Sequence, residues 1–167
     1  MFGKRASPIV AIITAIMFWL SVPMIVWGAE DDVPADVRQY AEEIGSMYGI
    51  CPELIEAICW RETRFTPTAV NKAGTCHGIM QVYVKWHKDR MKQLGVTDIY
   101  DTYGNMLVAT DYLVSILEVH EDIGEALMIY SGNSSARVNR YIETGVMSSY
   151  ADDVLERSYQ YEKLHGK

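Results

Sequence analysis

Apolar side chains recur every three or four residues along most of the chain, which is the spacing of one face of a helix. The first such stripe lies between Pro34 and Gly49, and these residue types favour the start and the end of a helix respectively. Its members are Val37, Tyr40, Ala41, Ile44, Met47 and Tyr48. The pattern therefore predicts an amphipathic helix over this segment.

A second helix is predicted to begin at Pro52, which is well suited to the first helical position. Its apolar positions are Leu54, Ile55, Ile58 and Cys59. We expect it to stop near Thr66, because Pro67 disfavours helical geometry in the residue before it.

The remaining sequence predicts further helices and one irregular stretch. Residues 67–82 contain the turn formers Asn71, Gly74 and Gly78, so this is where a small β-element fits. Helical spacing returns over about 83–93, from Gly104 to about 117, and then over about 123–130, 135–143 and 149–164. The helix after Gly104 is apolar and long enough to be central. The predicted class is mainly α: orthogonally packed helices with a minor β-loop.

Residues 1–29 have a different pattern. Lys4 and Arg5 precede an apolar run from Ile9 to Trp27, and no further charge occurs until Glu30. Such a segment is typical of a cleaved export signal or of a single N-terminal membrane anchor, and its length does not separate the two. Either way the basic start stays cytoplasmic, so we expect one domain over residues 30–167 outside the membrane.

The charge and the cysteine and histidine patterns exclude several partners. The whole chain carries a net charge of −7, and residues 30–167 carry −9 because Lys4 and Arg5 are the only charges before them. An acidic domain without a basic stripe is a poor nucleic-acid binder. No CxxC occurs, and His77 and His87 lack the spacing of metal ligands, so we expect neither a metal nor another cofactor.

Glu62 is the strongest candidate for chemistry. It continues the apolar stripe of the second predicted helix, which runs through Ile55, Ile58 and Cys59. Partial burial disfavours a charged carboxylate, and so does the negative end of the helix dipole. Arg61 and Arg64 should flank the carboxyl group without facing it. We therefore expect Glu62 to have a raised pKa, as a general acid acting near neutral pH requires.

Residues 48–82 resemble the lytic transglycosylase domain of the soluble-lytic-transglycosylase type, in the lysozyme-like superfamily. The matching positions are Glu62-Thr63, Phe65, Pro67, Asn71, Gly74 and Gly78-Ile79-Met80-Gln81. Later segments are similar as well, at Asn105, Ala109, Tyr112 and Leu113 and at Ala126, Leu127 and Tyr130. The resemblance covers about residues 36–160. It implies a lysozyme-like α+β fold with a small β-element beside the catalytic helix.

The resemblance also implies roles for individual residues. Glu62 would be the sole catalytic acid and base, and the substrate-binding positions would be Thr63, Gly78, Met80, Gln81 and Tyr130. A glycine at 78 would let the backbone approach a sugar closely, and a tyrosine at 130 offers an apolar face with a hydroxyl group. The family usually has serine where Thr63 stands and asparagine where Ser131 stands. The first change keeps the hydroxyl group, whereas the second loses an amide.

The implied reaction is cleavage of peptidoglycan glycan strands between MurNAc and GlcNAc, closing a 1,6-anhydro ring on MurNAc. No Asp or Glu occurs from Thr63 to Lys88, so the segment facing Glu62 offers no second carboxylate of the kind that most glycosidases use. Asp89, Asp98, Asp101 or Asp111 could still fold into the cleft. A muramidase that uses water, and a non-catalytic wall-binding or assembly module, remain the alternative functions.

Two further expectations concern the cysteines and the partners. Cys59 lies one turn before Glu62 and Cys76 just before the Gly78–Gln81 loop, so a disulfide between them would fix this loop to the catalytic helix. The expected partners are the glycan strands and, if residues 1–29 are retained, the membrane. A secretion or conjugation complex is a third candidate partner, since a small exported enzyme suits local opening of the wall.

Overall fold

The computed structural model describes residues 31–167. The predicted export signal or anchor in residues 1–29 therefore lies outside the described residues. Within the described part, no helix combines the length and apolar character that crossing a membrane would need.

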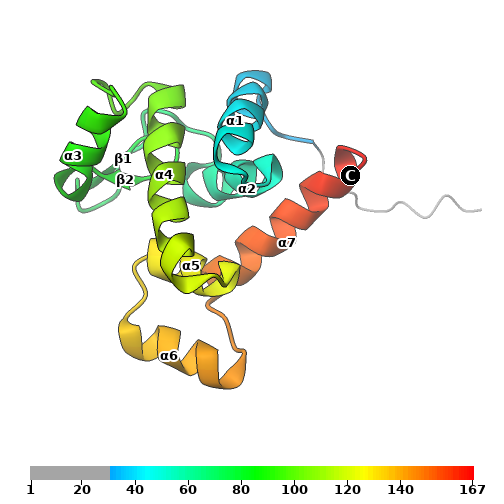
Figure 1. The fold of residues 1–167 in the computed structure, drawn as a ribbon. Helices are drawn as coiled ribbons and strands as arrows, with labels where there is room; N and C mark the ends of the chain where they lie inside the picture. The colour runs from blue at the N-terminus through cyan, green and yellow to red at the C-terminus, as the bar shows by residue number, and fades with distance from the viewer. Residues whose placement is uncertain (1–30) are drawn as a thin grey trace, which may run out of the picture.

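The described residues form seven helices and one two-stranded sheet, which confirms the predicted mainly α class (Figure 1). The elements are α1 (Ala35–Tyr48), α2 (Pro52–Thr63), β1 (Cys76–His77), β2 (Val82–Tyr83), α3 (Val84–Gln93), α4 (Thr102–His120), α5 (Ile123–Tyr130), α6 (Ser135–Thr144) and α7 (Ser149–Leu164). The strands are antiparallel, with Cys76 opposite Tyr83 and His77 opposite Val82. Except for Tyr83, which was expected in the following helix, they lie in the segment predicted to hold a small β-element.

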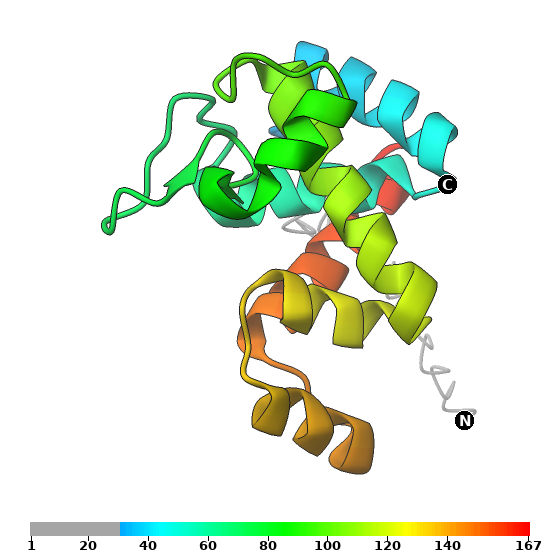
Figure 2. The same cartoon turned by 60° about the vertical axis from the view of Figure 1, so that its left-hand side comes forward.

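Helix α4 is the central element. It packs against α1, α3, α5 and β2, and it separates α3 and the strands from α1 and α2 in Figure 1. Its side chains from Gly104 to Thr110 are all buried. The helix starts at Thr102 because the Asp101 carboxylate accepts a hydrogen bond from the Gly104 N–H at 2.7 Å. Helix α6 packs mainly on α5 and extends away from the other helices (Figure 2).

Helix α2 ends at Thr63, three residues before the predicted stop. Arg64 and Phe65 adopt left-handed backbone conformations, with φ of 52° and 61°, and turn the chain out of the helix. The Arg64 N–H closes the last turn on the Trp60 carbonyl at 3.0 Å. The helix therefore ends at the left-handed turn of Arg64 and Phe65 and not at Pro67. It places Glu62 within the last helical turn.

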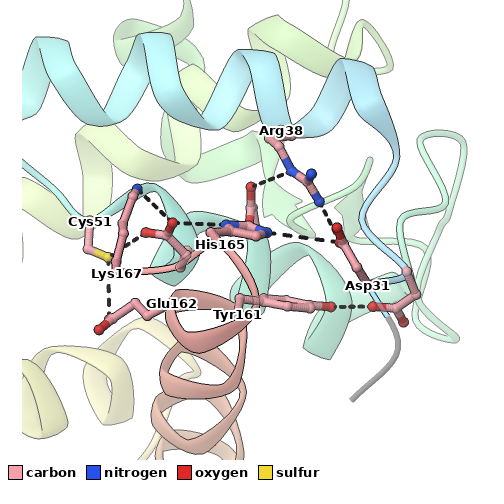
Figure 3. Close-up of polar contacts among 10 residues, drawn as sticks. Asp31, Arg38, Cys51, Tyr161, Glu162, His165 and Lys167 are labelled. Carbon is pink, nitrogen blue, oxygen red and sulfur yellow. Dashed lines mark hydrogen bonds and ion pairs between the residues drawn. The ribbon is translucent and has the colours of Figure 1, made fainter. Parts of the chain in front are cut away.

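The α2 helix packs along α7, and polar contacts join them at the N-terminal end of α2 (Figure 3). Glu53 is buried and binds His165 at 2.9 Å and Lys167 at 2.7 Å, both just beyond α7. Burial by itself would raise the pKa of Glu53. Hydrogen bonds from Lys167, Cys51 and His165 outweigh this effect and lower the pKa to about 2.

Glu56 lies one turn further along α2 and is equally buried, but neither of its carboxyl oxygens has a hydrogen-bond partner among the described residues. The basic side chains within 4 Å are those of Arg38 and His165, whose Nε and Nδ1 atoms each lie 3.9 Å from a carboxyl oxygen. Burial raises the pKa of Glu56 to about 7, so the fold favours its protonated form.

The two glutamates predict opposite pH effects on stability. Because the folded pKa of Glu56 is raised, its contribution is complete below the ordinary pKa and is lost as pH rises through about 7. We expect Glu56→Gln to increase the free energy of unfolding by roughly 1–3 kcal/mol at pH 8 and to change it little at pH 4. Thermal and denaturant unfolding at both pH values would measure this.

Glu53→Gln is the matched control, with the same substitution one turn away. The folded pKa of Glu53 is lowered, so its contribution is present above the ordinary pKa and is lost as pH falls toward about 2. We expect Glu53→Gln to destabilise the fold by roughly 1–3 kcal/mol at pH 8. Changes of the same sign at pH 8 in both variants would contradict the assignment.

Candidate active site

A cleft of about 450 Å³ lies at the C-terminal end of α2. Its walls come from the last turn of α2, the loop and strands over residues 71–83, the start of α3, the middle of α4 and the end of α5. The lining residues are Glu62, Asn71, Thr75, Cys76, Gln81, Val82, Tyr83, Trp86, His87, Ala109, Tyr112, Ile129, Tyr130, Ser131 and Gly132. Among these described residues, Glu62 is the only carboxylic acid.

Glu62 is partly buried, and this burial raises its pKa, as its place in the apolar stripe predicted. Two weaker effects act in the opposite direction: a hydrogen bond from Tyr150 and the positive charge of Arg61. Arg61 itself forms an ion pair with Asp153 at 3.1 Å. The result is a carboxylic acid that keeps its proton to a higher pH than an exposed glutamate.

Tyr150 is the site residue that the sequence did not reveal. It lies in the first turn of α7, and its hydroxyl group donates a hydrogen bond of 2.6 Å to Glu62 Oε1. In the sequence it stands 88 residues from Glu62, within the predicted helix over about 149–164. No local signal could have linked the two residues, because their contact depends on the packing of α7 against α2.

Two of the predicted substrate-binding residues, Gln81 and Tyr130, line the cleft with Glu62. The Tyr130 hydroxyl donates to the Met80 carbonyl at 2.8 Å, and burial next to Glu62 raises the Tyr130 pKa far above its usual range. The ring of Tyr130 is tilted against that of Tyr112, with centroids 5.8 Å apart. Tyr130 therefore joins the loop after β1 to one wall of the cleft.

The model of the family described as the transglycosylase SLT domain matches residues 39–146 of the chain, which is more than half of its length. The chain belongs to the SLT domain family. The match ends just before α7, so Tyr150 lies beyond the matched residues. No curated protein matches the chain.

Among solved structures, the SLT domain is similar to an inactive mutant of the lytic transglycosylase Slt from Pseudomonas aeruginosa. The TM-score is 0.65 at 17% sequence identity. The match covers 80% of this chain but only 25% of the other, so the chain spans about a quarter of that enzyme's length. The likeness confirms the mainly α, lysozyme-like fold.

Three other predicted substrate-binding residues of the SLT domain do not line the cleft. Thr63 Oγ1 donates to the Ile79 carbonyl at 2.8 Å and accepts from the Thr66 N–H at 3.1 Å. The side chain of Met80 is fully buried in the core. Gly78 is buried as well, so these residues build the loop that carries Gln81.

Gly78 has a packing role in the structure, and the expected close approach of its backbone to a sugar stays a prediction. Its φ of +80° favours glycine, and a Cβ atom at this position would lie 2.0 Å from Asn105 Nδ2. The space next to Gly78 is therefore filled by protein. Its small size lets the loop pack against α4.

The side chain of Asn105 holds the loop around Gly78 close to α4. It is fully buried on α4, and its Oδ1 accepts from the Met80 N–H at 2.9 Å. Its Nδ2 donates to the carbonyls of His77 and Ile99, each at 2.9 Å. One amide thus satisfies three backbone groups of two loops, which holds the cleft wall in place.

The predicted Cys59–Cys76 disulfide is not formed. Cys51, Cys59 and Cys76 are all free thiols in the structure. Cys59 is fully buried in the core face of α2, whereas Cys76 is partly exposed and lines the cleft. The loop is fixed to its surroundings by the hydrogen bonds of Thr63, Asn105 and Tyr130 instead.

The other aspartates considered as a second acid point elsewhere. Asp98 and Asp101 accept hydrogen bonds from the backbone N–H groups of Tyr100 and Gly104. Asp111 pairs with Arg90 and accepts from the Tyr48 hydroxyl. Asp89 lines a neighbouring hollow and not the cleft. Within residues 31–167, no group of three or more His, Cys, Asp and Glu side chains could hold a metal ion.

Tyr150→Phe tests the contact with Glu62. The hydroxyl stabilises the ionised carboxylate, so its loss should raise the pKa of Glu62 further. We expect the high-pH limb of the pH–rate profile to move to higher pH and kcat/KM at neutral pH to fall roughly tenfold. Tyr159→Phe, an exposed tyrosine of the same helix, should leave both unchanged. An unshifted limb in Tyr150→Phe would contradict the assignment.

Proposed function

We propose that this SLT domain is a peptidoglycan lytic transglycosylase that cleaves the β-1,4 bond between MurNAc and GlcNAc and leaves a 1,6-anhydro ring on MurNAc. The observation that carries the proposal is the cleft with Glu62 as its one carboxyl group among the described residues and with a raised pKa. Such a group can act first as an acid and then as a base.

The protonated Glu62 donates its proton to the glycosidic oxygen as the bond breaks. The ionised Glu62 then takes the proton of the 6-hydroxyl group of the same MurNAc unit, whose oxygen bonds to C1. The attack is intramolecular, so it gains from proximity and needs no protein nucleophile or second carboxylate. The Tyr150 hydroxyl supports the ionised form between the two steps, at 2.6 Å from Oε1.

The comparisons support this assignment in two ways. The family model is that of a transglycosylase domain, and the similar solved structure is a lytic transglycosylase. The inactive mutant in that structure carries glutamine in place of one glutamate. A single glutamate can therefore be essential to an enzyme of this fold, which is the role proposed here for Glu62.

Activity on peptidoglycan places the domain outside the cytoplasmic membrane. Residues 1–29 would serve as an export signal or as a membrane anchor, consistent with Lys4 and Arg5 before the apolar run. Retention of the segment would keep the enzyme at the membrane, where a secretion or conjugation apparatus could recruit it for local wall opening.

Product analysis tests the proposed reaction. The purified chain is incubated with peptidoglycan, and the released muropeptides are weighed by mass spectrometry. We expect 1,6-anhydro-MurNAc ends, which are lighter than reducing ends by one water. Products with reducing ends would make the protein a muramidase. Absence of any release would make it a wall-binding module without catalysis.

A further inference from the structure

Trp86 is a large apolar side chain at the mouth of the cleft and is 75% exposed. It lies in the first turn of α3. An aromatic ring of this size, open to water at the edge of a concave and largely apolar cleft, is suited to contact a bound molecule.

Trp86 and the next residue, His87, have opposite environments: Trp86 is exposed and His87 is buried. Helix α3 is kinked at His87, where φ is −111° and ψ is 15°. His87 is buried, and its ring contacts that of Tyr112 with centroids 4.6 Å apart. Trp86 remains at the rim, where the ring of Tyr83 packs edge-on against it at 4.6 Å and 76°. The contact restrains the indole without covering it, so a ligand would meet an already oriented ring.

A second hollow, of about 470 Å³, is also lined by Trp86. Trp86, His87 and Tyr112 line both spaces, so the two spaces adjoin at these three aromatic residues. The second hollow is polar where the cleft is largely apolar. Its other lining residues are Asp89, Arg90, Gln93 and Asp111.

These features suit one more unit of a β-1,4-linked N-acetylated glycan. In such a pyranose the ring substituents are equatorial, so both ring faces present C–H groups and the polar groups project from the edge. An aromatic ring can cover the face while polar side chains bind the edge. Asp89 and Gln93 are exposed in the hollow, whereas Arg90 is held by Asp111 and Ser115.

We propose that Trp86 is the stacking platform of an additional sugar-binding subsite, which extends the substrate groove from the Glu62 cleft toward α3. The proposal rests on the proposed function, because it identifies the occupant as a further sugar of the strand that Glu62 cleaves. Trp86 is a binding residue and takes no part in proton transfer.

The subsite is tested by measuring the binding of sugar oligomers to a variant that does not cleave them. The full chain with Glu62→Gln is titrated with β-1,4-linked GlcNAc oligomers of two, four and six units, by calorimetry. With Trp86 present, affinity is expected to rise with oligomer length. Trp86→Ala in the same background should weaken binding of the longest oligomer about tenfold and leave the shortest unchanged. Trp86→Phe should restore part of the loss.

Tyr159→Ala is the matched control, an exposed aromatic residue on α7 that lines neither space. It should bind every oligomer like the parent. Equal affinities of the Trp86→Ala variant and the parent for all lengths would overturn the subsite, even if the native chain releases anhydro-muropeptides. A parent that binds no oligomer, together with a native chain that releases nothing from peptidoglycan, would overturn the proposed function itself.

Discussion

Glu62→Gln is expected to lower the rate of anhydro-muropeptide release by about 10³-fold or more, while the unfolding temperature stays close to that of the native chain. Glutamine is similar in size and can still accept the hydrogen bond from Tyr150, but it can neither donate a proton to the leaving oxygen nor accept one from a hydroxyl group. Initial rates of muropeptide release and thermal unfolding of the same preparations would measure the two effects.

Glu56→Gln is the control that isolates the chemistry. It makes the same change in the same helix, at a glutamate that is buried away from the cleft and also has a raised pKa. We expect it to keep near-native activity. If Glu62→Gln retained more than about a tenth of the native rate, the single-acid mechanism would fail, because a missing acid–base group typically costs about 10²-fold or more.

Gly78→Ala is expected to destabilise the fold by roughly 3–5 kcal/mol and to reduce activity with it. An added Cβ would lie 2.0 Å from Asn105 Nδ2 and 2.8 Å from the Ile99 carbonyl oxygen, and the φ of +80° would be strained for alanine. Relief of the clash would displace the amide that binds Met80, His77 and Ile99. Denaturant unfolding would measure the loss.

Gly74→Ala separates the two sources of this cost. Gly74 belongs to the same loop and has a φ of +68°, but no atom lies within 4 Å of its added Cβ. It should cost only the backbone strain, about 1 kcal/mol. Equal destabilisation by the two substitutions would show that the packing of Gly78 on Asn105 contributes little.

The cleft depends on elements from opposite ends of the domain. The acid comes from α2, its hydrogen-bond donor comes from α7, and the amide that holds the loop comes from α4. The family match ends at residue 146, before α7 begins. Variation in α7 could therefore change the pKa of Glu62 without altering the matched segment.

The sequence by itself determined the helices and the candidate acid. Helical spacing depends on neighbours within a few residues, so the stripes located α1 and α4 and placed Glu62 at the buried edge of α2. The early end of α2 was not predicted. Glycine is the usual sequence signal for a left-handed turn at a helix end, and this turn is formed by Arg64 and Phe65.

Only the tertiary structure decided which residues surround Glu62. The Tyr150 hydroxyl reaches it across 88 positions, Gly78 packs against Asn105, and Cys59 and Cys76 are free thiols. Each of these depends on how helices pack against one another, which no short-range pattern records. Local periodicity fixes which face of a helix is buried, whereas the partners of that face are set by long-range packing.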